Sequence, residues 1–153
     1  MAIGGSNQKS LCNCTALRKA TRRVSQLYDS ALEPCGLRTT QRAILGQIAR
    51  SGTPPLGELA EALVMDRGAL THNLKPLERD GLVAISVDPD DRRNRLVALT
   101  AAGRARLAES EPLWKRAQGG FEAAFGATKS ASLRKALEYL VSEDFAVAFG
   151  DRG

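Results

Sequence analysis

A short charged segment between two apolar runs holds the residues with the clearest chemical potential in this sequence. The segment DPDDRRNR, residues 88–95, separates residues 83–87 from residues 96–99, and both flanking runs have the composition of β-strands. DPDD is typical of a turn, because Pro fixes its φ and Asp side chains bond nearby N–H groups. A solvated hairpin tip would explain the charges, but neighbouring arginines repel one another unless they meet an anion. The segment therefore predicts either a plain charged turn or an anion-binding hairpin.

The other residues with reactive side chains do not form a catalytic or metal-binding set. Cys12, Cys14 and Cys35 lack the repeated Cys-x-x-Cys spacing of a zinc site, and His72 is the one histidine. No glycine-rich phosphate loop follows a strand, and no Ser-His-acid set can be assembled. We therefore predict that the protein is not an enzyme, binds no metal or cofactor, and keeps its thiols reduced.

Size and charge limit the class of protein. With 153 residues, 43% hydrophobic and 25% charged, the chain is long enough for one globular domain with its own core. Its formal charge of +5 favours a polyanionic partner. No run approaches the roughly 20 apolar residues that cross a bilayer, and residues 1–10 have no apolar signal-peptide core. These features predict a cytoplasmic protein with no membrane contact.

Amphipathic helices are predicted ahead of the charged segment. Residues 13–33 have apolar side chains at helical spacing, and the EPCG sequence around their end stops the helix because Pro and Gly both interrupt helices. A second helix, capped by Thr39 or Thr40, ends at Gly52.

Residues 56–83 contain two further apolar stripes, which predict a pair of short helices joined by a tight turn. Asp66 is placed to cap the second helix and Gly81 to end it. A helix pair followed by a hairpin with a basic tip is the order of a winged helix-turn-helix. In that fold the second helix fits the DNA major groove and the hairpin reaches the minor groove. The chain is therefore predicted to be mainly α with a small β-hairpin wing, whose arginines face phosphates and a narrow groove.

The remainder of the chain, residues 101–149, is predicted to be helical again, in two parts. Pro112 and the Gly119-Gly120 pair interrupt the first part. A core of this size hardly needs further apolar helices. Residues 13–33 and 101–149 are therefore predicted to pair with a second copy, as a palindromic DNA site requires.

Residues 56–107 carry an LxxLAxxL run, an LT…LxxLExxGLV run and, above all, the sequence DRRNRLVALTAAG. These motifs resemble the winged helix-turn-helix core of the MarR family of bacterial transcriptional regulators. The flanking helices agree in order and length, so the resemblance makes residues 1–153 one domain, with residues 56–100 as its DNA-binding core. It implies a homodimer with interlocked terminal helices that represses genes until a small ligand or an oxidant weakens DNA binding.

The resemblance also implies roles for individual residues. Arg93 would enter the minor groove, with Asp91 holding it or a neighbour in position and Arg92 and Arg95 beside it. The recognition helix would present the polar residues outside its leucine stripe. Arg and Lys pair with guanine edges and Asn with adenine, but the sequence leaves open which residues read bases and which contact phosphates. These residues are Arg67, Thr71, His72, Asn73 and Lys75.

Two positions depart from the family pattern. His72 stands where the family often has Arg, so it either changes the base preference or is a surface histidine that faces phosphate or solvent. Pro76 lies inside the recognition helix, where it removes a backbone hydrogen bond and is expected to bend the helix.

The resemblance implies two kinds of effector. The commoner is an aromatic or phenolic anion, whose carboxylate would meet Arg22, Arg23 or Arg38, although a basic helix face is usually just solvated. The alternative is organic peroxide. The spacing of Cys14 and Tyr28 resembles the peroxide-sensing branch, in which tyrosines hydrogen-bond a reactive cysteine. A small buried hydrophobe at a dimer interface is the plainer interpretation of that cysteine.

A winged helix used only for protein contacts is the remaining alternative. Such a module would not need an arginine-bearing tip together with a polar helix face. Loss of DNA binding on Arg93→Ala separates the two classes, and the sequence favours the DNA-binding regulator.

Overall fold

The computed structural model describes residues 11–150, so the polar segment 1–10, for which no signal peptide is expected, lies outside the described residues. Within residues 11–150 the chain is mainly α-helical with one two-stranded antiparallel hairpin, as predicted. The elements in chain order are α1 Asn13–Leu32, η1 Glu33–Cys35, α2 Thr39–Ser51, α3 Leu56–Ala62, α4 Arg67–Arg79, β1 Val83–Val87, β2 Arg95–Leu99, α5 Ala101–Phe125, α6 Ala127–Leu140 and α7 Glu143–Gly150.

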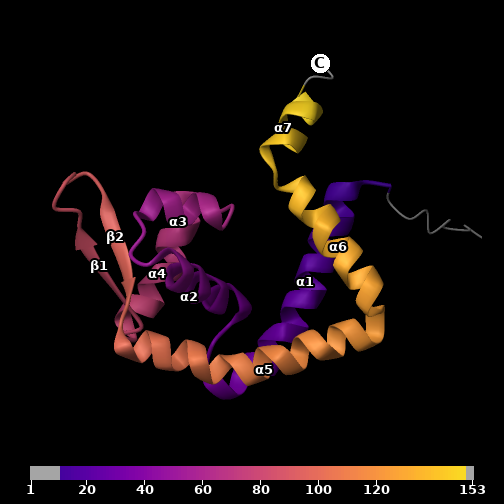
Figure 1. Ribbon diagram of the computed structural model, residues 1–153, viewed down its shortest axis with the longest axis horizontal. Helices are drawn as coiled ribbons and strands as arrows, with labels where there is room; N and C mark the ends of the chain where they lie inside the picture. Colours follow the sequence, from indigo (N-terminus) through magenta and orange to yellow (C-terminus); the bar gives the residue numbers. More distant parts are fainter. Residues whose placement is uncertain (1–10, 151–153) are drawn as a thin grey trace, which may run out of the picture.

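Figure 1 shows two groups of elements joined by the long helix α5. On one side lie α2, α3, α4 and the β1–β2 hairpin, residues 39–99, which we call the reading head. On the other side lie α1, α6 and α7. Helix α1 packs along α5, and β2 leads directly into the start of α5. One continuous helix therefore connects the hairpin to the terminal helices.

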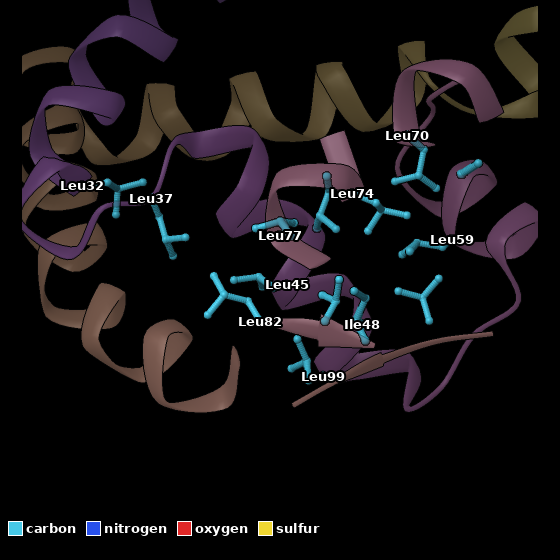
Figure 2. Close-up of a cluster of buried hydrophobic side chains, with 14 of the residues drawn as sticks. Leu32, Leu37, Leu45, Ile48, Leu59, Leu70, Leu74, Leu77, Leu82 and Leu99 are labelled. Atoms are coloured by element: carbon cyan, nitrogen blue, oxygen red, sulfur yellow. The ribbon is translucent and has the colours of Figure 1, made fainter. Parts of the chain in front are cut away.

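The core of the reading head is a cluster of buried apolar side chains drawn from all its elements (Figure 2). Leu70, Leu74 and Leu77 are the buried residues of α4, as their helical spacing predicts. Leu59 of α3 and Leu99 of β2 belong to the same cluster. Because the leucines bury one side of α4, its polar side chains are left on the solvent side.

The junction between α1 and α2 differs from the sequence prediction in how α2 begins. The 3-10 turn after α1 ends at Gly36, whose φ of 71° lies in the left-handed region that glycine adopts readily. Neither Thr39 nor Thr40 caps α2, because the N-cap residue is Arg38. The N–H of Thr39 donates to Asp29 Oδ1 of α1 at 2.7 Å. A carboxylate from another helix thus satisfies the N-terminus that a threonine was expected to cap.

The turn between α3 and α4 is a Schellman motif with an unusual residue in its left-handed position. The N–H of Met65 donates to the carbonyl of Ala60 at 2.9 Å, and the N–H of Val64 donates to that of Glu61 at 3.0 Å. Val64 has a φ of 52°, and among residues 11–150 it is the one non-glycine residue with a positive φ. Glycine usually takes this position, because a β-branched side chain is strained there.

Replacement of Val64 by glycine is expected to stabilise the protein. Relief of the left-handed strain gains about 1–2 kcal/mol, while the extra freedom of glycine in the unfolded chain costs about 0.4–1 kcal/mol. The free energy of unfolding should therefore rise by up to about 1.6 kcal/mol. Chemical denaturation of the two proteins at equal concentration measures the difference. A less stable Val64→Gly protein would mean that packing of the valine outweighs its strain.

The hairpin has the predicted antiparallel pairing, with Val87 opposite Arg95 at its outer end. β2 therefore begins at Arg95, one residue before the apolar run. The N–H of Val97 donates to the carbonyl of Pro54 at 3.0 Å, which fixes β2 to the loop before α3. The base of the hairpin is thus attached to the reading head, while its loop, residues 88–94, projects as the wing tip (Figure 1).

The start of α5 is fastened to the end of α4. Thr100 caps α5 by accepting the N–H of Gly103 at 3.0 Å, and its hydroxyl donates to the carbonyl of Gly81 at 2.5 Å. Gly103 is buried, and a Cβ at this position would overlap the carbonyl oxygen of Leu82. The glycine of the LTAAG sequence is therefore required by the close approach of two backbones.

The C-terminal helices differ from the sequence prediction in where they are interrupted. Helix α5 runs without a break through Pro112 and the Gly119-Gly120 pair, where interruptions were expected. The following segment, expected as one helix, is divided into α6 and α7. Ser142 between them accepts the N–H of Phe145 at 3.2 Å and caps α7.

A polar contact between α2 and α5 explains how α5 tolerates its proline. The Arg42 guanidinium lies over the ring of Trp114, 4.7 Å from its centroid, and Arg42 donates to Ser110 Oγ at 3.0 Å and Glu111 Oε2 at 2.7 Å. These partners lie on both sides of Pro112. Tertiary contacts therefore hold the helix where proline removes a backbone hydrogen bond.

Candidate nucleic-acid interface

Helix α4 presents a polar face to solvent. Asp66 caps its N-terminus by accepting a backbone N–H at 2.8 Å, as the sequence predicts. Arg67, Thr71 and Lys75 follow one another at four-residue intervals, so they lie along one face, and all three are exposed. His72, next to this row, is exposed as well. Four of the five residues predicted for the recognition helix therefore face solvent.

The fifth, Asn73, is half-buried and turned toward its own helix. Its amide Nδ2 donates to the carbonyl of Ala69 at 2.8 Å, which fixes the plane of the amide. Pro76 does not end the helix, since α4 continues to Arg79, but it removes the N–H that would bond the carbonyl of His72. The bend expected at Pro76 stays a prediction.

Arg67 lies against α3, at a residue that sequence analysis did not single out. A Cβ built on Gly57 would stand 2.5 Å from Arg67 Nη2, so the guanidinium occupies the space beside that glycine. A glycine inside an otherwise amphipathic helix signals such a close approach, and it could have been recognised on that ground. Gly57 thus leaves room for Arg67 between the two helices.

The wing tip has a defined turn geometry. The N–H of Asp90 donates to Asp88 Oδ1 at 2.9 Å, which is the Asx turn that DPDD predicts. The N–H of Asp88 donates to the carbonyl of Asn94 at 3.1 Å and closes the loop. Arg95 folds back beneath the loop and donates to the carbonyl of Arg92 at 3.2 Å. Arg95 therefore helps to shape the tip, and both Arg92 and Arg95 are exposed.

Asp91 and Arg93 form a two-pronged ion pair on the wing tip. Arg93 Nε donates to Asp91 Oδ1, and Arg93 Nη2 donates to Asp91 Oδ2, both at 3.0 Å. The Arg93 side chain is 89% exposed and that of Asp91 34% exposed. Because a paired guanidinium has a fixed plane, the remaining N–H groups of Arg93 are held toward solvent in one orientation.

Asp91 is expected to titrate at a lower pH than an ordinary aspartate. Hydrogen bonds from the Arg93 side chain, and then from its backbone N–H, lower the pKa of Asp91. The ion pair is therefore complete above about pH 3.9, the ordinary pKa of Asp, and is lost as the pH falls through the lower folded-state pKa. NMR titration of the carboxyl carbon measures this pKa. Arg93→Ala should raise it toward the ordinary range, and no change would mean that the pair is absent in solution.

The arginines predicted to meet an anionic effector do not lie together. Arg22 and Arg23 are exposed on α1, whereas Arg38 stands 3.8 Å from Asp29 at the start of α2. A groove of about 360 Å³ runs between α1, α5 and α6, and Arg134 is the arginine that lines it. The sequence prediction did not include Arg134, because its place in the groove depends on how α6 folds back onto α1.

Polar side chains form a chain of hydrogen bonds along this groove. Tyr28 donates to Gln118 at 2.8 Å, and Gln118 donates to Glu122 at 3.0 Å. Arg134 pairs with Glu122 at 3.3 Å. Burial raises the pKa of Tyr28, and the negative charge of Glu122 adds to the effect. In this chain of hydrogen bonds, the partner of the Tyr28 hydroxyl is Gln118, a residue of α5.

Cys14 lies at the exposed start of α1 and does not meet Tyr28 within one chain. The two residues are fourteen positions apart on the same helix, which is about 21 Å along its axis. Cys12 precedes the helix, and its Sγ accepts the N–H of Thr15 at 3.5 Å. Hydrogen bonds from the Thr15 side chain, and then from its backbone N–H, lower the pKa of Cys12 and so favour its thiolate form.

No group of three His, Cys, Asp or Glu side chains within residues 11–150 is arranged to hold a metal ion. None of the helices in this range is both long and apolar enough to span a bilayer.

Comparisons with known proteins agree with this architecture. The MarR family model matches residues 37–94, from just before α2 to the wing tip. The crystal structure of M. tuberculosis MosR in complex with DNA is 37% identical and covers 84% of this chain and 97% of MosR, with a TM-score of 0.71. The structure of CouR, a transcriptional repressor bound to a 23-mer DNA duplex, is 26% identical and covers 86% of this chain and 93% of CouR, with a TM-score of 0.78.

A further relative is the transcriptional activatory protein BadR of Rhodopseudomonas palustris, 43% identical over 77 residues. The match covers 48% of this chain and 44% of BadR, so it spans less than half the length of that relative. These relatives are transcriptional regulators rather than enzymes, and the likeness to MosR extends over nearly the whole of MosR. The chain therefore belongs to the MarR family of transcriptional regulators.

Proposed function

We propose that this protein is a homodimeric repressor that acts in the cytoplasm and binds a palindromic operator in double-stranded DNA. Helix α4 enters the major groove, and Arg93 on the wing tip enters the neighbouring minor groove. The observation that carries the proposal is the Asp91–Arg93 pair, which aims an exposed guanidinium outward from a fixed hairpin. A narrow minor groove attracts such a cation through its negative potential.

The exposed face of α4 supports the proposed contact with the major groove. Arg67, His72 and Lys75 offer hydrogen-bond donors on one side of a helix whose other side is buried. Arginine and lysine donors fit guanine edges and phosphates. MosR and CouR, which match this chain over most of its length, were both solved with DNA. A net charge of +5 adds general affinity for DNA.

The homodimer is supported by where apolar side chains remain exposed. Most of the large exposed apolar residues lie on the helices outside the reading head. A second copy that packs its own terminal helices against them would remove this surface from water, and two-fold symmetry would match a palindromic site. These residues are Leu17 and Leu27 of α1, Phe125 of α5, Leu133, Leu137 and Tyr139 of α6, Val141, and Val147 and Phe149 of α7.

We further propose that a small aromatic or phenolic anion releases the protein from DNA. The groove between α1, α5 and α6 combines apolar walls, among them Val24 and Phe121, with the polar groups of Tyr28, Gln118 and Arg134. Apolar walls with a few placed polar groups are typical of small-molecule sites. Arg134 replaces Arg22, Arg23 and Arg38 as the first candidate for the carboxylate.

Selection of binding sequences from a random duplex pool tests the central proposal. The purified protein at moderate salt should enrich an inverted repeat whose half-sites lie about one helical turn apart. Sedimentation of the free protein should give the mass of two chains. If no sequence is enriched, the operator-binding function is wrong. If a sequence is enriched, a reporter gene placed behind that site distinguishes repression from activation.

Thiol-based sensing of organic peroxide is the second candidate function. It is favoured by the exposed Cys14, which lines a groove with Leu140, Phe145 and Phe149 where an apolar peroxide could lie. Cys14→Ser should then abolish the loss of operator binding that peroxide causes in the native protein. Equal peroxide sensitivity of the native and Cys14→Ser proteins would exclude Cys14 as the sensor.

A further inference from the structure

Val64 is an apolar side chain in a position where both the backbone and the solvent disfavour it. It has a φ of 52° in the turn between α3 and α4, and 67% of its surface is exposed. The Schellman hydrogen bonds of Val64 and Met65 fix this backbone conformation, which glycine or asparagine would adopt with less strain. Strained residues cluster at functional sites, so the strain at an exposed valine points to a function.

Neither packing nor the proposed dimer accounts for this valine. The neighbouring Met65 is the residue of the turn that packs against the core. Val64 lies in the reading head, between α3 and α4, whereas the apolar residues assigned to the dimer lie on α1, the end of α5, α6 and α7. Val64 therefore belongs neither to the core cluster nor to the surface assigned to the dimer.

The position of Val64 relative to α4 indicates what it would meet. It precedes the N-cap residue Asp66 by two positions, and the N-terminal end of a recognition helix is the part that contacts base edges. The only apolar group on a base edge in the major groove is the 5-methyl of thymine. A β-branched side chain on a fixed backbone has few rotamers to lose, so a contact with that methyl costs little ordering entropy.

We propose that Val64 is a specificity residue that contacts the 5-methyl group of one thymine in each operator half-site. The proposal rests on the proposed operator binding and adds to it an apolar base contact beside the polar donors of α4. It also gives a reason for the strained conformation, because the side chain is exposed in the turn that leads into α4.

Single replacement of each thymine in the selected operator by uracil tests the contact, because uracil differs from thymine only by the missing methyl. For the native protein, uracil at one position of each half-site should lower the affinity for the operator about threefold to fivefold, which is the effect of one buried methyl group. The same replacement should change the affinity of Val64→Gly by less than about 1.5-fold at that position. Val64→Asn, which also suits a left-handed backbone but is polar, is the second variant and should behave like Val64→Gly.

The outcomes separate this inference from the proposed function. If the uracil effect is equal in the native, Val64→Gly and Val64→Asn proteins, or if no thymine methyl matters to the native protein, the Val64 contact is wrong although operator binding stands. If no operator is selected at all, the proposed function fails first. Because Val64→Gly is expected to be the more stable protein, loss of the methyl effect in that variant cannot be attributed to unfolding.

Discussion

Arg93→Ala is expected to weaken operator binding on the order of 100-fold, because a guanidinium contact is worth about 1–3 kcal/mol and a dimer loses it from both wings. Fluorescence anisotropy with a labelled operator measures the change. Arg93 is the residue to change because Asp91 holds its side chain in one orientation while leaving it 89% exposed. The loss should be largest for the selected operator and smaller for unrelated DNA.

Two neighbouring variants are the controls for Arg93. Arg92→Ala removes an exposed charge that has no ion pair among the described residues, so it should cost only a few-fold in affinity, equally for all sequences. Asp91→Asn keeps the charge of Arg93 but removes the ion pair that orients it. This variant should lose preference for the operator over unrelated DNA, even though it removes a negative charge. Operator affinity unchanged by Arg93→Ala would exclude the wing from the interface and favour a protein-interaction module.

The second large effect is expected for Gly103→Ala, which should lower the free energy of unfolding by about 2–3 kcal/mol. The added methyl would overlap the carbonyl oxygen of Leu82 and lie 3.3 Å from Leu99 Cδ2. A flexible side chain could move aside, but this carbonyl accepts the N–H of Thr100 at 3.2 Å and belongs to a buried residue. The start of α5 must therefore shift away from the hairpin.

Gly119→Ala is the matched control, since it makes the same change in the same helix where nothing lies within 4 Å of the new methyl. Alanine is the better helix former, so this variant should gain about 0.5–1 kcal/mol. Urea denaturation at one protein concentration compares the two variants with the native chain. A Gly103→Ala protein as stable as the control would mean that α5 does not approach Leu82 so closely in solution.

The sequence predicted those features that depend on local patterns. The leucine stripe of α4, the cap at Asp66 and the hairpin between residues 83 and 99 were recognisable because each needs only a few neighbouring residues. The same holds for the wing tip, where Asp88 and its neighbours form the turn that their side chains favour.

Predictions failed where distant residues decide the outcome. Proline 112 was expected to interrupt a helix, but Arg42, 70 positions earlier, helps to hold α5 together through Trp114. Thr39 or Thr40 was expected to cap α2, but Arg38 is the N-cap residue and Asp29 of α1 accepts the N–H of Thr39. The close approaches at Gly57 and Gly103 also join separate elements, so the glycines could be noticed in the sequence while their partners could not.

The uninterrupted course of α5 has a consequence for the spacing of the operator. Its 25 residues span about 37 Å, close to one turn of B-DNA, between the hairpin and the terminal helices. In the proposed dimer, the length of this helix sets how far each reading head lies from the symmetry axis. It also sets the angular phase, because one inserted residue would turn the head by about 100°. In that dimer, the separation of the operator half-sites would therefore depend on the number of residues in α5.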